Sequence, residues 1–216
     1  MFVILAVALL QPVTPPSLQA RDSLWYRAVH ARDVTGDGIP DTLILEATGR
    51  RVDSLEVTLN IRSQGRRLYH ERWLSTYYFA YDAPTDSIPE STRRTQVFRH
   101  LSEFFSPERF SPLTTAGGSW KPRDDQDPRS AIAFDIKYRR ARDSLTRAHT
   151  QPDSVGSIAS RHAWSAPFDT SYVLRIWQEL ATTRRVTFTF FSGGEYTRTI
   201  VWSPILGRFV VVFSCC

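Results

Sequence analysis

The sequence predicts a single α+β domain with one antiparallel sheet and about three helices. Apolar and polar residues alternate with a period of two near both ends, over about residues 24–74 and 186–213. Between residues 97 and 180 the apolar residues recur at helical spacing. The chain has 216 residues, 42% hydrophobic and 23% charged, as in ordinary globular domains. We therefore expect the terminal strands to share one sheet, with the helices packed on one face of it.

Four strands are expected in the N-terminal part. The clearest alternation runs over residues 55–61, where every second residue is apolar and the residues between are polar. Similar patterns predict strands at 43–47 and 68–74, and a further strand at 24–32 precedes them. Turn residues separate these segments, notably Gly49 and the sequence Ser63-Gln64-Gly65. Together they predict an antiparallel meander.

Three apolar stripes predict helices in the middle of the chain. They lie at residues 97–105, ending before Pro107, at 134–148 and at 172–180, the last with Asp169 or Thr170 as a cap. The segments 81–91 and 111–129 are rich in Pro, Asp, Ser and Gly and are expected to be surface loops. The end of the chain returns to strands at 186–190, 196–202 and 209–213, with a hairpin turn at 192–195.

The first 20 residues are expected to be a secretory signal peptide. Residues 2–10 are uniformly apolar, which is too short to span a bilayer but suits a signal, and four Gln and Pro residues follow. Ala20 offers a small residue at a cleavage position, although no basic residue precedes the apolar run. The alternative is a buried N-terminal strand. A signal predicts a domain at 21–216, periplasmic or secreted, with no transmembrane segment after cleavage.

The net charge of +5, from 27 basic and 22 acidic residues, raises the question of a nucleic-acid partner. Nearly all the basic residues are Arg, in pairs scattered along the chain among acidic neighbours, and they form no basic tract. We therefore expect no nucleic-acid binding, unless the fold gathers these pairs on one face.

The strongest motif lies at residues 33–41, with the sequence DVTGDGIPD. Ca²⁺ takes six to eight oxygen ligands, and oxygen donors at alternate positions of a loop that folds back on itself suit this requirement. Gly38 stands where such a loop turns sharply. The candidate ligands are the side chains of Asp33, Thr35 and Asp37, the carbonyl of Ile39, and Asp41 directly or through water. An Asp- and Gly-rich hairpin turn without an ion is the alternative interpretation.

This pattern, D-x-T-G-D-G-x-P-D followed by an apolar strand, resembles the calcium loops of FG-GAP and VCBS-type repeats in exported bacterial proteins. The resemblance covers only about residues 30–47, and it implies calcium held between two strands. Position 3 is the neutral Thr35, and position 12 is Ile44 where an EF-hand has a Glu. The motif also occurs once instead of repeating. We expect weak affinity, with a Kd of about 10⁻⁴ to 10⁻³ M.

Other candidate features are weaker. The five His residues stand apart, and no nucleophile motif is present. The only two cysteines, Cys215 and Cys216, are adjacent; they exclude a disulfide framework but could form a vicinal disulfide, pair with another chain or stay reduced. Aromatic residues crowd the segment 73–81, and Trp25 adds another in the first predicted strand. Such a cluster suits core packing or, less commonly, stacking on a sugar. These residues are Trp25, Trp73, Tyr77, Tyr78, Phe79 and Tyr81.

The sequence therefore favours a non-enzymatic exported module of the bacterial cell envelope that calcium stabilises. Such a module either binds a protein or glycan or has only a structural role. The alternative is a periplasmic hydrolase-type enzyme whose site is assembled from dispersed residues such as His70, Asp135 and Glu195. A deep pocket with converging titratable groups would favour the enzyme, and a flat aromatic face would favour binding.

Overall fold

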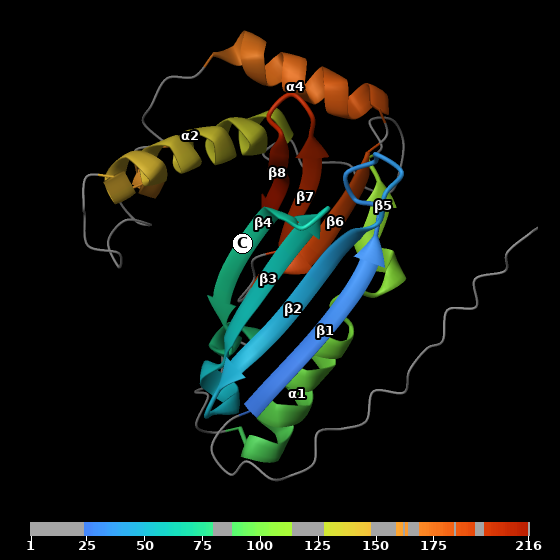
Figure 1. Cartoon of the computed structure of the whole chain (residues 1–216). Coiled ribbons are helices and arrows are strands. Elements are labelled where there is room, and N and C mark those ends of the chain that lie inside the picture. Colours follow the sequence, from blue (N-terminus) through green and yellow to red (C-terminus); the bar gives the residue numbers. More distant parts are fainter. Residues whose placement is uncertain are drawn as a thin grey trace, which may run out of the picture.

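The computed structural model describes residues 24–79, 88–113, 128–147, 159–161, 163, 169–183, 185–192 and 197–215. Within these ranges the chain forms two four-stranded antiparallel sheets and the helices α1, α2 and α4 (Figure 1). The α+β class and the number of long helices are as predicted. The prediction of one sheet is wrong, because the N-terminal and C-terminal strands pair only within their own groups. The predicted signal peptide lies outside the described residues.

The first sheet is the predicted meander, with its strands in chain order. Leu43, Leu45 and Ala47 of one strand are fully buried, whereas the residues between them face outward. On the outer face, charged residues of neighbouring strands pair, as Arg27 does with Glu46. Period-two alternation therefore gives this sheet one apolar and one polar face. Its strands are β1 (Leu24–Arg32), β2 (Asp41–Gly49), β3 (Glu56–Ser63) and β4 (Arg66–Leu74).

The second sheet has the order β5-β6-β7-β8. Its strands are β5 (Phe110–Pro112), β6 (Val186–Phe191), β7 (Thr197–Ser203) and β8 (Arg208–Cys215). The last three correspond to predicted strands, and β6 pairs antiparallel with β7 as expected, although residues 193–195 of the predicted turn lie outside the described part. Residues 111 and 112 of β5 fall in a segment expected to be a surface loop, and Phe110 was assigned to no element. Three residues are too few to show a period, and pairing of Phe110 with Phe188 makes them a strand.

The three long helices are α1 (Glu90–Ser102), α2 (Pro128–Arg147) and α4 (Thr170–Thr183). The predicted cap of α4 is confirmed, because Asp169 Oδ1 accepts hydrogen bonds from the N–H groups of Ser171 at 2.9 Å and Tyr172 at 3.3 Å. Both α1 and α2 begin several residues earlier than their apolar stripes. Residues 90–96 of α1 are all polar and carry no periodic signal, whereas residues 128–133 of α2 include the buried Ile132 and Ala133, which the predicted stripe left out. Single turns of 3₁₀ helix lie at η1 (Val52–Ser54), η2 (Ser75–Tyr78) and η4 (Pro107–Arg109).

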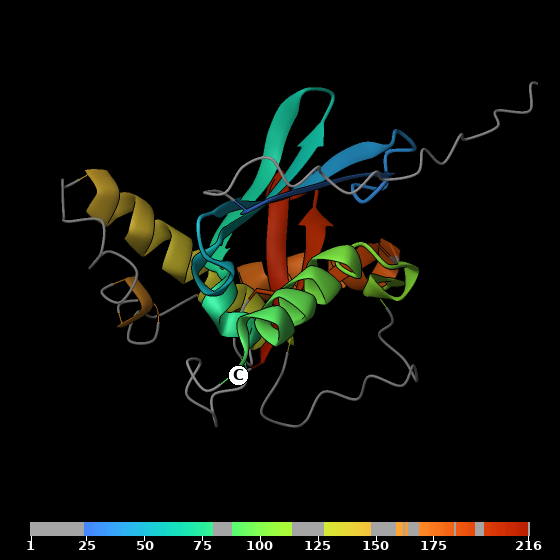
Figure 2. The ribbon, with the colours of Figure 1, turned by 90° about the horizontal axis from the view of Figure 1, so that it is seen from below.

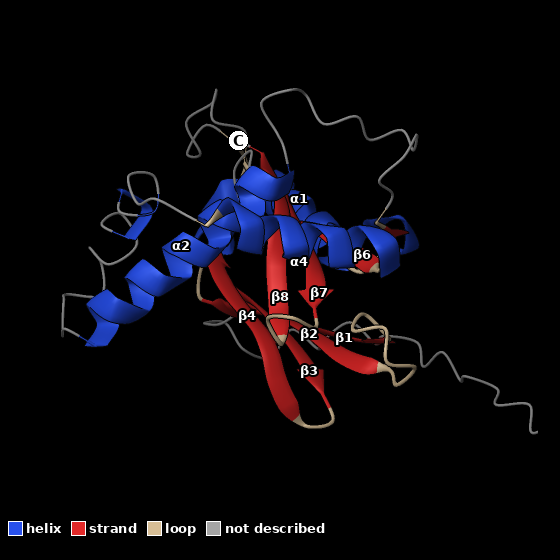
Figure 3. Ribbon diagram, turned by 90° about the horizontal axis from the view of Figure 1, so that it is seen from above, coloured by secondary structure: helices blue, strands red, loops and turns tan. Residues whose placement is uncertain are grey.

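The sequence predicted that all the helices pack on one face of a sheet, and this prediction is wrong. The second sheet is apolar on both faces: Phe188 and Phe209 face a core shared with the first sheet, whereas Val201 and Val210 face α2 and α4. Helix α1 contributes to the shared core and lies alongside the first sheet (Figure 2). Helices α2 and α4 cover β7 and β8 from the other side (Figure 3). A sheet with two apolar faces needs two covering layers.

The predicted aromatic cluster is part of the core. Trp73, Tyr78 and Phe79 are buried, and the Trp73 ring stacks on Phe104 and on Phe190 of the second sheet. Trp73 Nε1 also donates a hydrogen bond to the Tyr78 hydroxyl at 2.9 Å. These three rings join the two sheets and α1 and present no face for a sugar. The side chains of Trp25 and Tyr77, and all of Tyr81, lie outside what the structure describes.

Candidate metal centre

The 33–41 loop connects β1 to β2 at the end of the first sheet where β5 and β6 lie (Figure 1). Gly36 and Gly38 have φ angles of 75° and 84°, which residues with a side chain rarely adopt. These two glycines let the chain fold back within the nine-residue loop that holds all five predicted ligands. The local sequence therefore determines the shape of the loop.

Asp41, the first residue of β2, organises the loop from inside. Its side chain is fully buried, and its Oδ2 accepts hydrogen bonds from the N–H groups of Val34 and Thr35, both at 2.9 Å. The Thr35 hydroxyl donates to the same oxygen at 3.1 Å. The other oxygen, Oδ1, is also buried but has no hydrogen-bond partner among the described residues. A buried carboxylate oxygen without a partner is costly, and such an atom calls for an explanation.

Asp33 and Asp37 hold the outer part of the loop. Asp33 accepts from the N–H of Gly36 at 2.6 Å and from that of Gly38 at 2.8 Å, each with a different oxygen. Asp37 Oδ1 accepts from the N–H of Ile39 at 2.9 Å. Within the described residues no three Asp, Glu, His or Cys side chains converge as metal ligands. The carboxylates of Asp33 and Asp37 are thus arranged around loop amides.

The donor set nevertheless suits a hard cation. A carboxylate has about four acceptor positions, so an Asp that accepts one or two amide hydrogens still has lone pairs available. All the candidate ligands are oxygens, which favours Ca²⁺ or Mg²⁺ over metals that prefer nitrogen or sulfur. A bound cation would give Asp41 Oδ1 the partner that this buried oxygen lacks among the described residues. The type of donor atom therefore suits a calcium ion, and the buried oxygen without a partner among the described residues is the observation that distinguishes this loop from an ordinary turn.

The loop is anchored to the second sheet by a residue that the sequence did not indicate. Arg185, directly before β6, donates from Nη1 to the carbonyl of Thr35 at 2.6 Å, across 150 residues of chain. Its Nη2 lies 3.6 Å from Glu179 Oε1 of α4. A Cβ at Gly36 would lie only 2.7 Å from Arg185 Nη1, so the guanidinium packs directly against the turn. Arg185 belongs to one of several Arg pairs, and nothing in its neighbourhood marks it.

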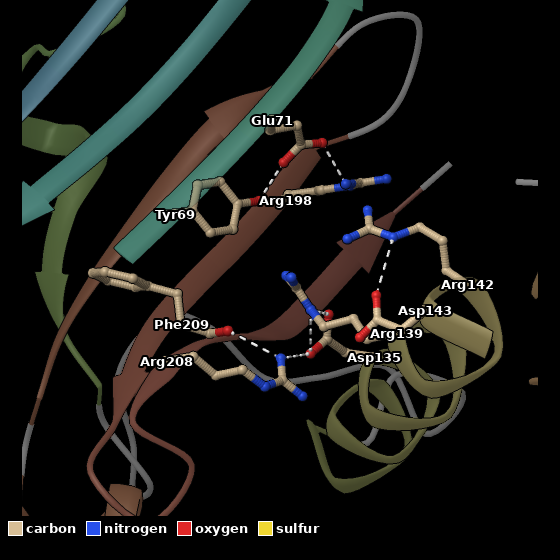
Figure 4. Close-up of polar contacts among 9 residues, drawn as sticks. All are labelled: Tyr69, Glu71, Asp135, Arg139, Arg142, Asp143, Arg198, Arg208 and Phe209. Carbon is tan, nitrogen blue, oxygen red and sulfur yellow. Dashed lines mark hydrogen bonds and ion pairs between the residues drawn. The ribbon is translucent and has the colours of Figure 1, made fainter. Parts of the chain in front are cut away.

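A second polar cluster joins the two sheets to α2 (Figure 4). Tyr69 and Arg198 both hydrogen-bond to Glu71, one to each carboxylate oxygen. Asp135 of α2 accepts from Arg139 Nε at 2.9 Å and from Arg208 Nη1 at 2.7 Å. Burial, and then the neighbouring Glu71 carboxylate, raise the pKa of the Tyr69 hydroxyl well above its ordinary value. This hydroxyl therefore remains a neutral donor at physiological pH.

Two of the residues suggested for a dispersed enzyme site, His70 and Asp135, lie in different environments and have different partners. His70 lies on the outer face of the first sheet, exposed, with Nδ1 3.0 Å from Asn60 Oδ1. Asp135 is instead buried against α2 and β8, where two Arg side chains occupy its oxygens. Glu195 lies outside the described residues. The side chains of His70 and Asp135 therefore have different partners. A carboxylate that binds two guanidinium groups is suited to an ion-pair network.

Two other histidines pack among aromatic rings. His30 stacks between Phe105 and Phe110, and His100 stacks between Tyr78 and Phe191. Burial, more than neighbouring Arg residues, lowers the pKa of both imidazoles below the ordinary value. Both are therefore neutral at pH 7. The Cys215 side chain and Cys216 lie outside the described residues, so the predicted pairing stays a prediction.

A pocket between α2 and α4 has a volume of about 70 Å³ and is lined by residues including Lys137, Asp169 and Tyr172. Pockets that bind drug-sized ligands typically measure about 300–1,000 Å³. This pocket can therefore hold a few water molecules but no substrate of ordinary size. No described helix is both long enough and apolar enough to cross a membrane.

Comparison of the chain with protein-family models, with curated proteins and with solved structures returned no match. The likeness to FG-GAP and VCBS-type loops therefore stays a resemblance of the loop sequence alone.

Proposed function

We propose that this chain is a non-enzymatic, exported module of the bacterial cell envelope whose 33–41 loop binds Ca²⁺, and that the module serves a structural role or binds a protein or glycan. The observation that carries the proposal is Asp41 Oδ1, a buried carboxylate oxygen without a hydrogen-bond partner among the described residues. A cation beside this oxygen removes the cost of burying it unpaired. Asp33, Thr35, Asp37 and the Ile39 carbonyl supply the remaining oxygens from the same loop.

The expected contribution is modest and measurable. With three carboxylates and no closing Glu, we expect a Kd of about 10⁻⁴ to 10⁻³ M, which suits the calcium concentrations outside cells. At 10 mM free Ca²⁺ such a site raises the free energy of unfolding by about 1.4–2.7 kcal/mol. This gain would stabilise a domain that has no disulfide framework. The ion would supply charge neutralisation for the loop carboxylates and close the end of the first sheet.

Isothermal titration calorimetry of the full-length protein with CaCl₂ tests the proposal, together with melting in EDTA and in 10 mM Ca²⁺. We expect weak binding and an increase in Tm in the wild type, and loss of both in Asp37→Asn, which removes one charge from the exposed side of the loop. Asp143→Asn, an exposed Asp of α2, is the matched control and should bind Ca²⁺ as the wild type does. Absence of binding, or unchanged binding in Asp37→Asn, would leave the loop as a hairpin turn.

A further inference from the structure

Three polar groups connect the 33–41 loop to α4, and one of them, the Thr35 carbonyl, is 150 residues away from Arg185 in the sequence. The Thr35 carbonyl accepts from Arg185 Nη1 at 2.6 Å, and Arg185 Nη2 faces Glu179 Oε1 at 3.6 Å. The Arg185 and Glu179 side chains are only 19% and 20% exposed. This connection, from Thr35 through Arg185 to Glu179, joins the loop, the start of β6 and the last turns of α4.

Some buried polar atoms of this connection have no hydrogen-bond partner among the described residues. Arg185 Nε and Glu179 Oε2 are both buried without a hydrogen-bond partner among the described residues. Their ion pair at 3.6 Å is longer than a well-formed charged hydrogen bond of about 2.7–2.9 Å. Together with Asp41 Oδ1, three buried polar atoms of the loop and of the Arg185–Glu179 pair have no hydrogen-bond partner within the part of the chain that the structure describes. A small rearrangement of the loop can therefore change how well the whole connection is satisfied.

We propose that cation binding at the 33–41 loop is coupled to the seating of α4 on the second sheet through Thr35, Arg185 and Glu179. This inference rests on the proposed calcium site and assigns it a regulatory consequence. Thr35 is itself a candidate ligand through its side chain and stands between Asp33 and Asp37, so a cation that fixes the loop also fixes the Thr35 carbonyl, to which Arg185 binds. Glu179 offsets the charge of the guanidinium, which would otherwise repel the cation.

Coupling of this kind is reciprocal: if the cation stabilises the Arg185 contact, the Arg185 contact must tighten cation binding by the same factor. Two effects of Arg185 oppose each other, since its positive charge disfavours a nearby cation while its hydrogen bond holds the loop in place. The proposal requires that the positioning effect is the larger. Substitutions that change the hydrogen bonding of residue 185 with and without changing its charge therefore show which effect is larger.

The experiment measures the Ca²⁺ affinity of full-length Arg185→Ala and Arg185→Lys by calorimetry. Lys keeps the charge but cannot bridge Thr35 and Glu179 with a planar fork. We expect both variants to bind Ca²⁺ at least about fivefold more weakly than the wild type. Arg94→Ala, which removes an exposed Arg that pairs with Glu90 on α1, is the control and should bind normally.

Hydrogen exchange with and without Ca²⁺ gives a second measurement that does not depend on affinity. In the wild type we expect Ca²⁺ to slow amide exchange in the loop and also in α4 (Thr170–Thr183). In Arg185→Lys, at saturating Ca²⁺, slowing should persist in the loop and disappear from α4.

The outcomes separate the coupling from the calcium site itself. If the wild type does not bind Ca²⁺, the proposed function fails. If the wild type binds but both variants bind equally well, or Arg185→Ala binds more tightly while Arg185→Lys is unchanged, the site stands and the coupling is wrong. In the second case Arg185 would act only as a repelling charge.

Discussion

The carboxylate of Asp41 accepts a hydrogen bond at 2.9 Å from the backbone N–H of Val34, seven residues earlier in the chain. This contact closes the β1–β2 connection from within, and the neighbouring N–H of Thr35 strengthens it. The loop therefore has a folded shape of its own, determined by one buried acidic side chain. A cation would act on a loop that is already formed, at the oxygen that these amides do not use.

We predict that Asp41→Asn lowers the free energy of unfolding by about 1–3 kcal/mol, even in EDTA. The amide keeps the size of the side chain but has only one acceptor oxygen, so an NH₂ group is left at the buried Oδ1 position or at the Val34 and Thr35 amides. Urea unfolding measures the change. Asp37→Asn is the comparison, since its exposed side chain can keep the hydrogen bond from Ile39. Equal stability of the two variants would contradict the organising role of Asp41.

Gly36→Ala is expected to destabilise the protein more than Gly38→Ala. Both positions have positive φ, so each substitution costs about 1–2 kcal/mol of backbone strain. A Cβ at position 36 also meets the Arg185 guanidinium at 2.7 Å, whereas one at position 38 meets nothing within 4 Å. We expect an additional loss of about 1 kcal/mol at position 36, from disturbance of the Arg185 hydrogen bond.

The same pair of glycine variants in an Arg185→Ala background provides the control for this prediction. Without the guanidinium, the additional cost at position 36 should vanish, and both alanines should cost about the same. An excess cost that persists in that background would mean that Arg185 does not press on the turn. Urea unfolding of the wild type, of Arg185→Ala and of the four alanine variants gives each cost against its own parent.

Asp135→Asn is predicted to destabilise the protein by about 2–3 kcal/mol, below the 3–5 kcal/mol typical of breaking a fully buried ion pair. The lower figure applies because Arg139 and Arg208 are 28% and 26% exposed and regain some hydration. Both guanidinium groups lose their charged partner at once. Glu90→Gln, in an exposed pair with Arg94, should change stability by no more than about 0.5 kcal/mol. A similar small effect at Asp135 would show that the cluster does not stabilise the fold.

The free energy of unfolding should fall as the pH is lowered from 7 to 5. His100 has a pKa below its ordinary value in the folded protein, first because of burial and second because of Arg99. The unfolded chain therefore binds more protons in this range, and stability present above pH 6.5 is lost as the pH falls toward the folded-state pKa. His100→Phe retains a ring between Tyr78 and Phe191 and should reduce the slope. His30 shifts in the same direction, so some slope should remain. An unchanged slope in His100→Phe would contradict this assignment.

Most elements of this fold were predictable because their signals are local. Alternation in residues 55–61 reports which side of a strand is buried, and the position of Asp169 before an apolar stripe reports a helix start. The glycines and acidic residues of the 33–41 loop likewise predict its turn chemistry, because the contacts they make are at most seven residues apart. Strand β5 had no such signal, because only its pairing with β6 defines it.

The sequence by itself determined the α+β class, the meander and a loop rich in oxygen donors. Only the tertiary structure decided that there are two sheets, that the helices cover different faces, and that Arg185 reaches the Thr35 carbonyl. It also placed Asp135 between two Arg residues, whereas His70 pairs with Asn60. The physical reason is that periodicity records whether a residue is buried, whereas the identity of its partner depends on how distant segments pack.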